Sequence, residues 1–270
     1  MKVSVLGCGW LGLPVARRLL AEDYNVKGST TTVDKLTSLS DYSIKAYHLE
    51  AMPQIHAANV QDFFDSDILI LTLPFRRSLK DPSYYKEQIT SVLQYVKQSS
   101  IKKIIFTSST AVYPDDIGVV EEDTSFKIDS KRSQVLWDVE QMLFDCDHCD
   151  TIVLRLAGLY GGERKLGRFL SAKKVMRHED STVNLVHLED CVNIITLCTK
   201  RSLGNVIFNI CSDEHPKRGE LYIKAAKNLN VEPPVFDEKA VLTTKCVSNA
   251  KLKKSLSYSF IHSNPLNDLA

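Results

Sequence analysis

Three glycines at spacings of two and three interrupt the apolar run that opens the chain, MKVSVLGCGWLG. Gly7, Gly9 and Gly12 follow a strand-like segment and precede a helix-like one, the context in which this pattern is informative. The first glycine permits a tight turn, the second lets the backbone approach a diphosphate, and the third lets the helix pack closely on the strand. The pattern predicts dinucleotide binding at a helix start. The alternative is that the glycines serve only a tight turn.

Short aliphatic segments alternate with amphipathic ones over the first 161 residues. The strand-like segments, bounded by turn residues, are 2–7, 24–29, 43–49, 67–73, 101–109 and 151–161. Between them, 11–23 and 83–98 place apolar residues three and four positions apart, as a helix packed on a sheet requires. Continuous apolar strands alternating with such helices predict an α/β fold with a doubly wound parallel sheet of the Rossmann type.

The alternation becomes irregular beyond residue 161. Residues 162–183 are basic and weakly periodic, whereas 184–211 return to a strand, helix and strand pattern. We therefore predict a dinucleotide-binding core over 1–161, rejoined by 184–211. Residues 162–183 and 212–270 are expected to form a small mixed C-terminal lobe on the substrate side.

The composition argues against several classes of function. With 34 Lys and Arg against 33 Asp and Glu, the formal charge is +1, so no excess attracts nucleic acid or an anionic membrane. Apolar stretches such as 67–75 are far shorter than the roughly 20 residues that cross a bilayer, and the N-terminus lacks a secretory signal pattern. We expect a cytoplasmic monomer or homodimer that binds a small-molecule substrate or nucleotide.

Seven cysteines, an odd number, predict small buried thiols in a reducing compartment. Cys146 and Cys149, in CDHCD, have the spacing of half a zinc site. Because no second pair lies at a suitable spacing, we expect no metal centre here.

The end of the second predicted strand indicates which nicotinamide dinucleotide is bound. NAD sites usually carry Asp or Glu there, on the ribose hydroxyl. Here the segment KGSTTTVDK offers hydroxyls, amides and positive charge instead, from Lys27, Gly28, Ser29, Thr30, Thr31 and Lys35. This composition favours NADP, with NAD as the alternative. In the alternative reading, Asp34 only caps the following helix, and the segment says nothing about the choice between NADP and NAD.

Several segments resemble the extended, epimerase-like branch of the short-chain dehydrogenase/reductase superfamily. FTSSTAVYP at 106–114 resembles the segment that carries the catalytic Ser or Thr, which the resemblance places at Ser109. RLAGLYG at 155–161 resembles the segment that lines the nicotinamide pocket, and NLVHLEDCVNIITL at 184–197 resembles the later helix start of the epimerases.

A closer resemblance is to the bacterial YeeZ-type proteins, an atypical group within that superfamily. It extends over nearly the whole chain through GCGWLGLP, GSTTT, LTLPFRRS, FTSSTAVY, RLAGLYG with GRF, NLVHLED and FNICSDEHP. It implies the Rossmann fold and a nicotinamide cofactor, and more weakly an oxidoreductase or epimerase reaction. Beyond the glycines and the second strand end, we expect cofactor contacts from Trp10, Leu11, Leu73, Pro74 and Ala157.

One departure from the superfamily bears on catalysis. Its members use Tyr-x-x-x-Lys, in which the lysine lowers the pKa of the phenol from the next helical turn. None of the ten tyrosines here has lysine four residues later. Alignment through VEQML places Arg132 at the tyrosine position and Leu136 at the lysine position.

Three readings of that departure stay open. Catalysis uses another acid or base, with Ser109 orienting a carbonyl and Tyr113 or Tyr160 donating the proton. Alternatively, the protein binds a nucleotide without turning it over and reports redox state to a partner. In the third reading the glycine loop is kept for structure alone.

Basic side chains indicate the class of substrate. Arg76 and Arg77 follow the fourth predicted strand, at the edge where open α/β sheets bind ligands. Arg164 and Arg168 lie where epimerase-like relatives receive substrate, so we expect a small anionic or sugar-like molecule. His187 is a further substrate-binding candidate. Each of these side chains has a structural alternative, as a solvated charge or a hydrogen-bonded histidine.

Overall fold

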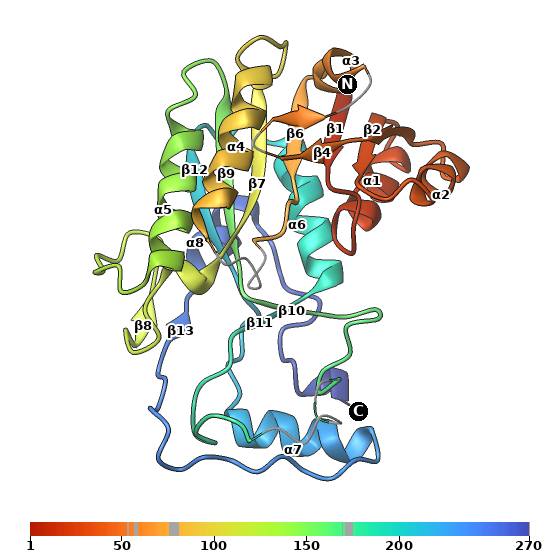
Figure 1. Ribbon diagram of the computed structural model, residues 1–270. Helices are drawn as coiled ribbons and strands as arrows, with labels where there is room; N and C mark the ends of the chain where they lie inside the picture. Colours follow the sequence, from red (N-terminus) through yellow and green to blue (C-terminus); the bar gives the residue numbers. More distant parts are fainter. Residues whose placement is uncertain (53, 57–58, 76–80, 169, 171–174, 270) are drawn as a thin grey trace. The chain divides into compact units, whose positions relative to one another are not determined.

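The computed structural model describes residues 1–52, 54–56, 59–75, 81–168, 170 and 175–269. It contains a seven-stranded parallel sheet with the strand order β12-β9-β7-β6-β1-β2-β3 (Figure 1). These strands are β1 (Lys2–Leu6), β2 (Asn25–Thr30), β3 (Lys45–His48), β6 (Ile68–Leu71), β7 (Lys103–Ser109), β9 (Asp150–Leu156) and β12 (Val206–Ile210). The predicted doubly wound α/β fold is confirmed.

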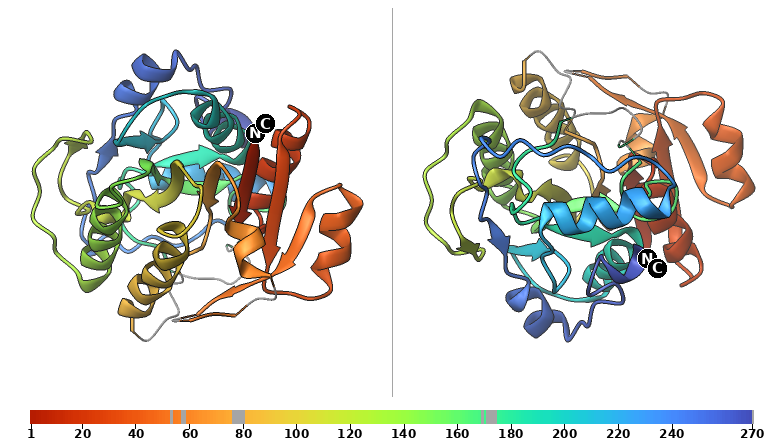
Figure 2. Two further views of the ribbon diagram at one scale, coloured as in Figure 1. Left: turned by 90° about the horizontal axis from the view of Figure 1, so that it is seen from above. Right: turned by 90° about the horizontal axis from the view of Figure 1, so that it is seen from below.

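Helices cover both faces of this sheet, which explains its continuous apolar strands. All four residues of β6 are at most 2 % exposed. In Figure 2, α4 and α5 lie on one face, and α1 and α6 lie on the other. The helices flanking the sheet are α1 (Gly12–Leu20), α2 (Lys35–Asp41), α3 (Val60–Phe64), α4 (Ser83–Val96), α5 (Lys131–Phe144) and α6 (Leu188–Lys200). Their apolar faces bury against the strands, as amphipathic periodicity requires.

The chain divides into two compact units. The first comprises residues 1–108, 129–154 and 192–207, including an antiparallel pair of β4 (Glu50–Ala51) and β5 (Ile55–His56). The second comprises 109–128, 155–191 and 208–270. Its elements are β8 (Val119–Val120), β10 (Gly158–Tyr160), β11 (Leu185–His187), β13 (Cys246–Val247), α7 (Arg218–Asn228), α8 (Ala250–Leu256), η1 (Thr110–Val112) and η3 (Asn267–Leu269).

This division differs from the predicted one in four segments. Residues 109–128, 155–161, 184–191 and 208–211 were expected in the dinucleotide-binding core, but they belong to the second unit. The reason is packing, because Tyr160 and Leu185 share an apolar core with Leu221 of α7.

The strand order reverses next to β1. The chain runs from β1 to β2 and β3 on one side, and then returns to β6 on the other side of β1. In open α/β sheets, ligands bind at the carboxyl ends of the strands at such a reversal. The glycine loop follows β1 at that point, and Thr72 follows β6.

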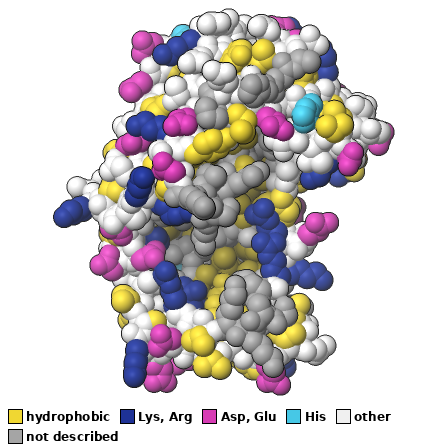
Figure 3. Space-filling view, in the orientation of Figure 1, with side chains coloured by type: hydrophobic (Ala, Val, Ile, Leu, Met, Phe, Trp, Pro, Cys, Tyr) yellow, Lys and Arg dark blue, Asp and Glu magenta, His cyan; other side chains and the backbone are white. Residues whose placement is uncertain are grey.

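The surface shows no concentration of one sign of charge on the face drawn in Figure 3, where Lys and Arg are interspersed with Asp and Glu. This mixture agrees with the formal charge of +1. Across the described residues, we find no helix with the length and apolarity needed to span a bilayer.

Candidate functional site

The three glycines of the loop have different surroundings. Gly7 has φ +105°, which side chains rarely adopt. A Cβ at Gly12 would lie 2.2 Å from the carbonyl oxygen of Gly7 and 2.7 Å from Thr72 Oγ1. Around Gly9, by contrast, no atom of the described residues beyond its chain neighbours lies within 4 Å of a Cβ position. The outer glycines are therefore demanded by the fold, whereas the middle one borders open space beside the start of α1.

Side chains from the two neighbouring strands hold the loop. The amide of Gly7 donates to Ser29 Oγ at 2.9 Å, and the amide of Cys8 donates to the Ser29 carbonyl at 2.7 Å. From β6, the hydroxyl of Thr72 donates to the carbonyl of Gly7 at 2.7 Å. Ser29 is 1 % exposed and its hydroxyl supports the loop. The cofactor contact expected of Ser29 stays a prediction. Thr72 was missed from the sequence, where only its place at the end of a strand marked it.

Lys27, which was expected to add positive charge to the cofactor site, is buried and only 4 % exposed. Its ammonium group donates to the carbonyls of Asp62 and Asp65, the latter at 2.7 Å. Lys27 therefore stabilises the end of α3 and is unavailable to a cofactor. Thr31 and Lys35 are exposed, at the end of β2 and the start of α2.

The other residues at this strand end have local roles. Thr30 is buried, and its hydroxyl accepts from the amide of Thr32 at 3.1 Å. A Cβ at Gly28 would lie 2.7 Å from Cys8 Sγ, so Gly28 allows close packing under the loop. Asp34 occupies the N-cap position of α2 without a capping hydrogen bond from its side chain.

The remaining predicted cofactor residues vary in exposure. Trp10 and Leu73 are half-buried and Pro74 is exposed, whereas Leu11 and Ala157 are buried. The carbonyl of Leu73 accepts from Tyr85 Oη at 3.1 Å, and the amide of Ala157 donates to the carbonyl of Ile210 at 3.0 Å. Their cofactor contacts stay a prediction.

Ser109 is the last residue of β7, and its side chain is half-buried. Its Oγ accepts a hydrogen bond from the amide of Ala111 at 3.1 Å and so caps η1. The hydroxyl proton is not used by that bond, so Ser109 retains a donor for a carbonyl oxygen. The preceding Ser108 is buried and donates to Glu140 Oε1 at 2.5 Å, a pair that the sequence did not indicate.

Tyr113 and Tyr160, for which a proton-donor role was predicted, are both buried. Tyr113 is 2 % exposed; its hydroxyl accepts from Arg155 Nη1 at 2.6 Å and donates to Asn209 Oδ1 at 2.9 Å. Tyr160 is 4 % exposed and donates to Asp268 Oδ2 at 2.6 Å. Burial raises the pKa of both phenols. Both hydroxyls are engaged inside the second unit, because each phenol completes a buried polar cluster.

The basic substrate-binding candidates have different standing. Arg76 and Arg77 lie outside the described residues. Arg168 is exposed and Arg164 is half-buried, and the pKa of Arg164 is lowered by burial and by the charge of Arg168. That they bind an anionic part of the substrate stays a prediction.

His187 lies in a histidine pair that the sequence did not indicate. Its ring lies against that of His262, with centroids 3.5 Å apart and the ring planes tilted by 35°. Both nitrogens of His262 face carboxylates, Asp268 Oδ1 at 2.8 Å and Glu189 Oε2 at 3.2 Å, so both carry protons. His187 Nδ1 accepts from the amide of Glu189 at 3.2 Å, which leaves the proton on Nε2. His187, Glu189 and His262 each place one ligand atom within 4.8 Å of the others.

Comparison with known proteins identifies the family. No family model matches the chain. The curated Protein YeeZ of Escherichia coli (strain K12) is 35 % identical over 268 residues, which cover 98 % of this chain and 97 % of that protein. The chain belongs to the YeeZ family. The motifs quoted from the sequence therefore mark a family relationship.

Solved structures with much lower identity share the fold. UDP-glucuronic acid 4-epimerase from Bacillus cereus, in complex with UDP-glucuronic acid and NAD, has a TM-score of 0.80 at 16 % identity, covering 100 % of this chain and 96 % of that one. A functionally unknown conserved protein from Silicibacter pomeroyi DSS has a TM-score of 0.77 at 19 % identity, covering 99 % and 96 %. This chain thus shares the fold of these two proteins.

In this YeeZ-family chain, α5 carries Arg132 and Leu136, the two residues that the sequence alignment through VEQML singled out. Leu136 is 1 % exposed and packs in the core. The Arg132 guanidinium lies over the ring of Phe75, 5.2 Å from its centroid.

The surroundings of Gly9 and Gly12 predict different effects of an added methyl group on stability. Gly12→Ala should lower the free energy of unfolding by about 1–3 kcal/mol, because the new Cβ overlaps the Gly7 carbonyl. Gly9→Ala should leave stability unchanged. Urea denaturation of both variants measures this, and equal stabilities would contradict the packing described for the loop.

The position of His262 between two carboxylates predicts that its contribution to stability depends on pH. Burial alone lowers its pKa, but the hydrogen bonds to Asp268 and Glu189 outweigh burial and raise it. A raised folded-state pKa means that the stabilisation is complete below the unfolded value of about 6.5 and is lost as pH rises through the folded pKa. The stability difference between wild type and His262→Gln should therefore be larger at pH 6 than at pH 9.

Urea denaturation at several pH values measures that difference, with His48→Gln, at a largely exposed histidine, as the control. A difference that grows with pH would contradict the assignment of two donated protons to His262.

Proposed function

We propose that the chain binds NADP, with NAD as the weaker alternative, at the loop Gly7–Gly12. The observation that carries the proposal is the open space at Gly9, between two glycines that the packing requires. A diphosphate placed there would face the amides at the start of α1, where helix geometry leaves N–H groups without intrahelical partners. The loop also follows β1 where the strand order reverses, the usual place for a dinucleotide in this fold.

The preference for NADP rests on the end of β2. No carboxylate occurs between Asn25 and Val33, so the usual acidic ligand of the NAD ribose is missing. Thr31 and Lys35 are exposed and offer a hydroxyl and an ammonium group to a 2′-phosphate. Lys27 is excluded from this role by the contacts described above.

The reaction we favour is oxidoreductase or epimerase chemistry on a small anionic or sugar-like substrate. When bound, the nicotinamide would supply hydride transfer. Ser109 would orient a substrate carbonyl through its unused hydroxyl proton, and Arg164 with Arg168 would bind an anionic group. The fold shared with the Bacillus cereus epimerase, which holds UDP-glucuronic acid and NAD, supports this class of substrate.

A second function is favoured by α5 and the buried tyrosines. Arg132 and Leu136 replace the tyrosine and lysine of the superfamily, and Tyr113 and Tyr160 have their hydroxyls engaged in buried clusters. A protein built this way would bind the nucleotide without turnover, and would act as a nucleotide-dependent regulatory or interaction protein. In either function we place it in the cytoplasm as a monomer or homodimer.

The glycine loop predicts which substitution abolishes binding. Gly9→Asp should weaken binding of NADP and NADPH at least about a hundredfold, or roughly 2.8 kcal/mol, because a carboxylate would occupy the place of the diphosphate. Calorimetric titration measures this. Thr37→Asp adds the same charge on an exposed part of α2 and should bind like wild type. Unchanged affinity in a folded Gly9→Asp variant would contradict the proposed site.

The strand end predicts a switch of cofactor. Thr31→Asp should reverse the preference from NADP to NAD by at least about tenfold, because the new carboxylate repels a 2′-phosphate and accepts from a ribose hydroxyl. The same titration with all four nucleotides measures the ratio, again with Thr37→Asp as control. An unchanged ratio of NADP to NAD affinity would mean that the adenosine end of the dinucleotide does not bind beside Thr31.

Turnover separates the two proposed functions. NADPH oxidation is measured across carbonyl compounds and nucleotide sugars, with wild type and Ser109→Ala. The enzyme proposal predicts a substrate whose turnover falls at least about tenfold in Ser109→Ala while NADPH affinity is kept. If no substrate is turned over, and the protein captures a partner only when nucleotide is present, the regulatory function holds.

A further inference from the structure

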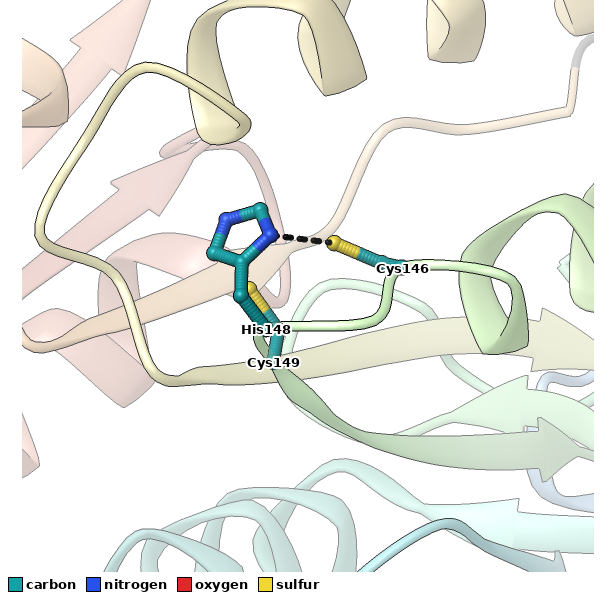
Figure 4. Close-up of side chains that lie close together, drawn as sticks. All are labelled: Cys146, His148 and Cys149. Carbon is teal, nitrogen blue, oxygen red and sulfur yellow. Dashed lines mark hydrogen bonds between the residues drawn. The ribbon is translucent and has the colours of Figure 1, made fainter.

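We propose that the turn between α5 and β9 binds a zinc-class divalent cation through Cys146, His148 and Cys149. These residues contribute one ligand atom each, and the three atoms all lie within 4.8 Å of one another. Figure 4 shows the His148 ring directed at the sulfur of Cys146, with Nδ1 3.8 Å from Sγ. Cys146 and Cys149 are 3 % and 6 % exposed, whereas His148 is half-buried, so the cluster is reached from one side.

The hydrogen bond on the far side of the His148 ring leaves Nδ1 able to bind a metal. Nε2 lies 3.1 Å from the carbonyl oxygen of Val96. A carbonyl only accepts, so Nε2 carries the proton and the lone pair of Nδ1 points at Cys146. Metal-binding histidines are commonly oriented in this way, with the second nitrogen donating to a backbone carbonyl.

The spacing of the ligand atoms suits a tetrahedral ion. Zinc lies about 2.3 Å from sulfur and about 2.0–2.1 Å from nitrogen, so a tetrahedral angle separates S and N by about 3.6 Å. The distance from Cys146 Sγ to His148 Nδ1 is 3.8 Å. This pair is therefore close to the tetrahedral separation, and the other two pairs of ligand atoms lie within 4.8 Å. The fourth position of the ion would take water from the open side.

The chemistry of the donors selects the class of cation. Two thiolates and one imidazole are soft or borderline ligands, which suit zinc and disfavour magnesium or calcium. On binding, both thiols release their protons, and the two thiolate charges balance the divalent ion without any redox step. Cys149 gives up its S–H contact to the carbonyl of Ile101, which is 3.2 Å long.

The position of the cluster indicates a structural role. Cys146 follows the end of α5, and Cys149 directly precedes β9. This is the amino end of β9, whereas the glycine loop follows the carboxyl end of β1 in the same parallel sheet. The ion would thus join α5 to the sheet at the edge opposite the proposed nucleotide site. From the sequence no metal centre was expected here, because no second cysteine pair lies at a suitable spacing. In the proposed site His148, between the two cysteines, is the third ligand.

Cobalt(II) is the probe for the test, because thiolate ligation gives it a charge-transfer absorption that zinc lacks. We expect the reduced full-length protein to bind one equivalent with this absorption, and zinc to displace it. Cys146→Ser and Cys149→Ser should abolish the band, and His148→Gln should weaken binding at least roughly tenfold. Cys246→Ser, at a half-buried cysteine outside the cluster, should bind like wild type.

Circular dichroism establishes that each variant is folded, and His148→Gln, at the half-buried ligand, keeps the test decisive if a cysteine variant unfolds. Zinc should also raise the midpoint of thermal unfolding of wild type, but not that of His148→Gln. The proposal is overturned if reduced protein gives no charge-transfer band, or if the band persists in Cys146→Ser and Cys149→Ser. A Cys146–Cys149 disulfide that forms in air and resists mild reductant would also overturn it.

Discussion

The start of α1 lies so close to the end of β1 that there is no room for a single methyl group at Gly12. That contact fixes the direction in which the chain leaves the sheet, and two neighbouring strands reinforce it. Ser29 of β2 accepts from the Gly7 amide, and Thr72 after β6 donates to the Gly7 carbonyl. The loop is thus held by three strands before any ligand arrives. A loop held in this way loses little conformational entropy on binding, which favours affinity.

The same architecture does not determine what happens to a bound nucleotide. Membership of the YeeZ family and the shared fold of the epimerases establish the scaffold, and one scaffold supports both catalysts and sensors. In this chain α5 packs Leu136 into the core and places Arg132 over Phe75.

The regular part of the fold could be predicted because period and turn residues specify it locally. The apolar run before Gly7, the amphipathic helices and the glycine spacing are all short-range signals. What failed were the roles of particular polar side chains. Lys27 was expected near a cofactor, but its partners are carbonyls of α3, 35 and 38 residues away. The hydroxyl of Ser29 was expected to contact the cofactor, and in the structure it accepts a hydrogen bond from the amide of Gly7.

The surroundings of Tyr113 and Tyr160 could not be predicted for the same physical reason. A tyrosine in a motif resembles an acid, but its pKa and exposure depend on what the fold packs around it. Arg155 lies 42 residues from Tyr113, and Asp268 lies 108 residues from Tyr160. His262 likewise became visible only when the chain brought it onto His187. Contacts over such separations leave no periodic signal in the sequence.

A crystal structure of the protein grown with NADPH tests the central claim most directly. The account predicts the diphosphate within hydrogen-bond distance of the amides that follow Gly9, and the 2′-phosphate beside Thr31 and Lys35. A dinucleotide bound away from the loop, or a loop that must rearrange at Gly7 or Gly12 to admit it, would contradict the account.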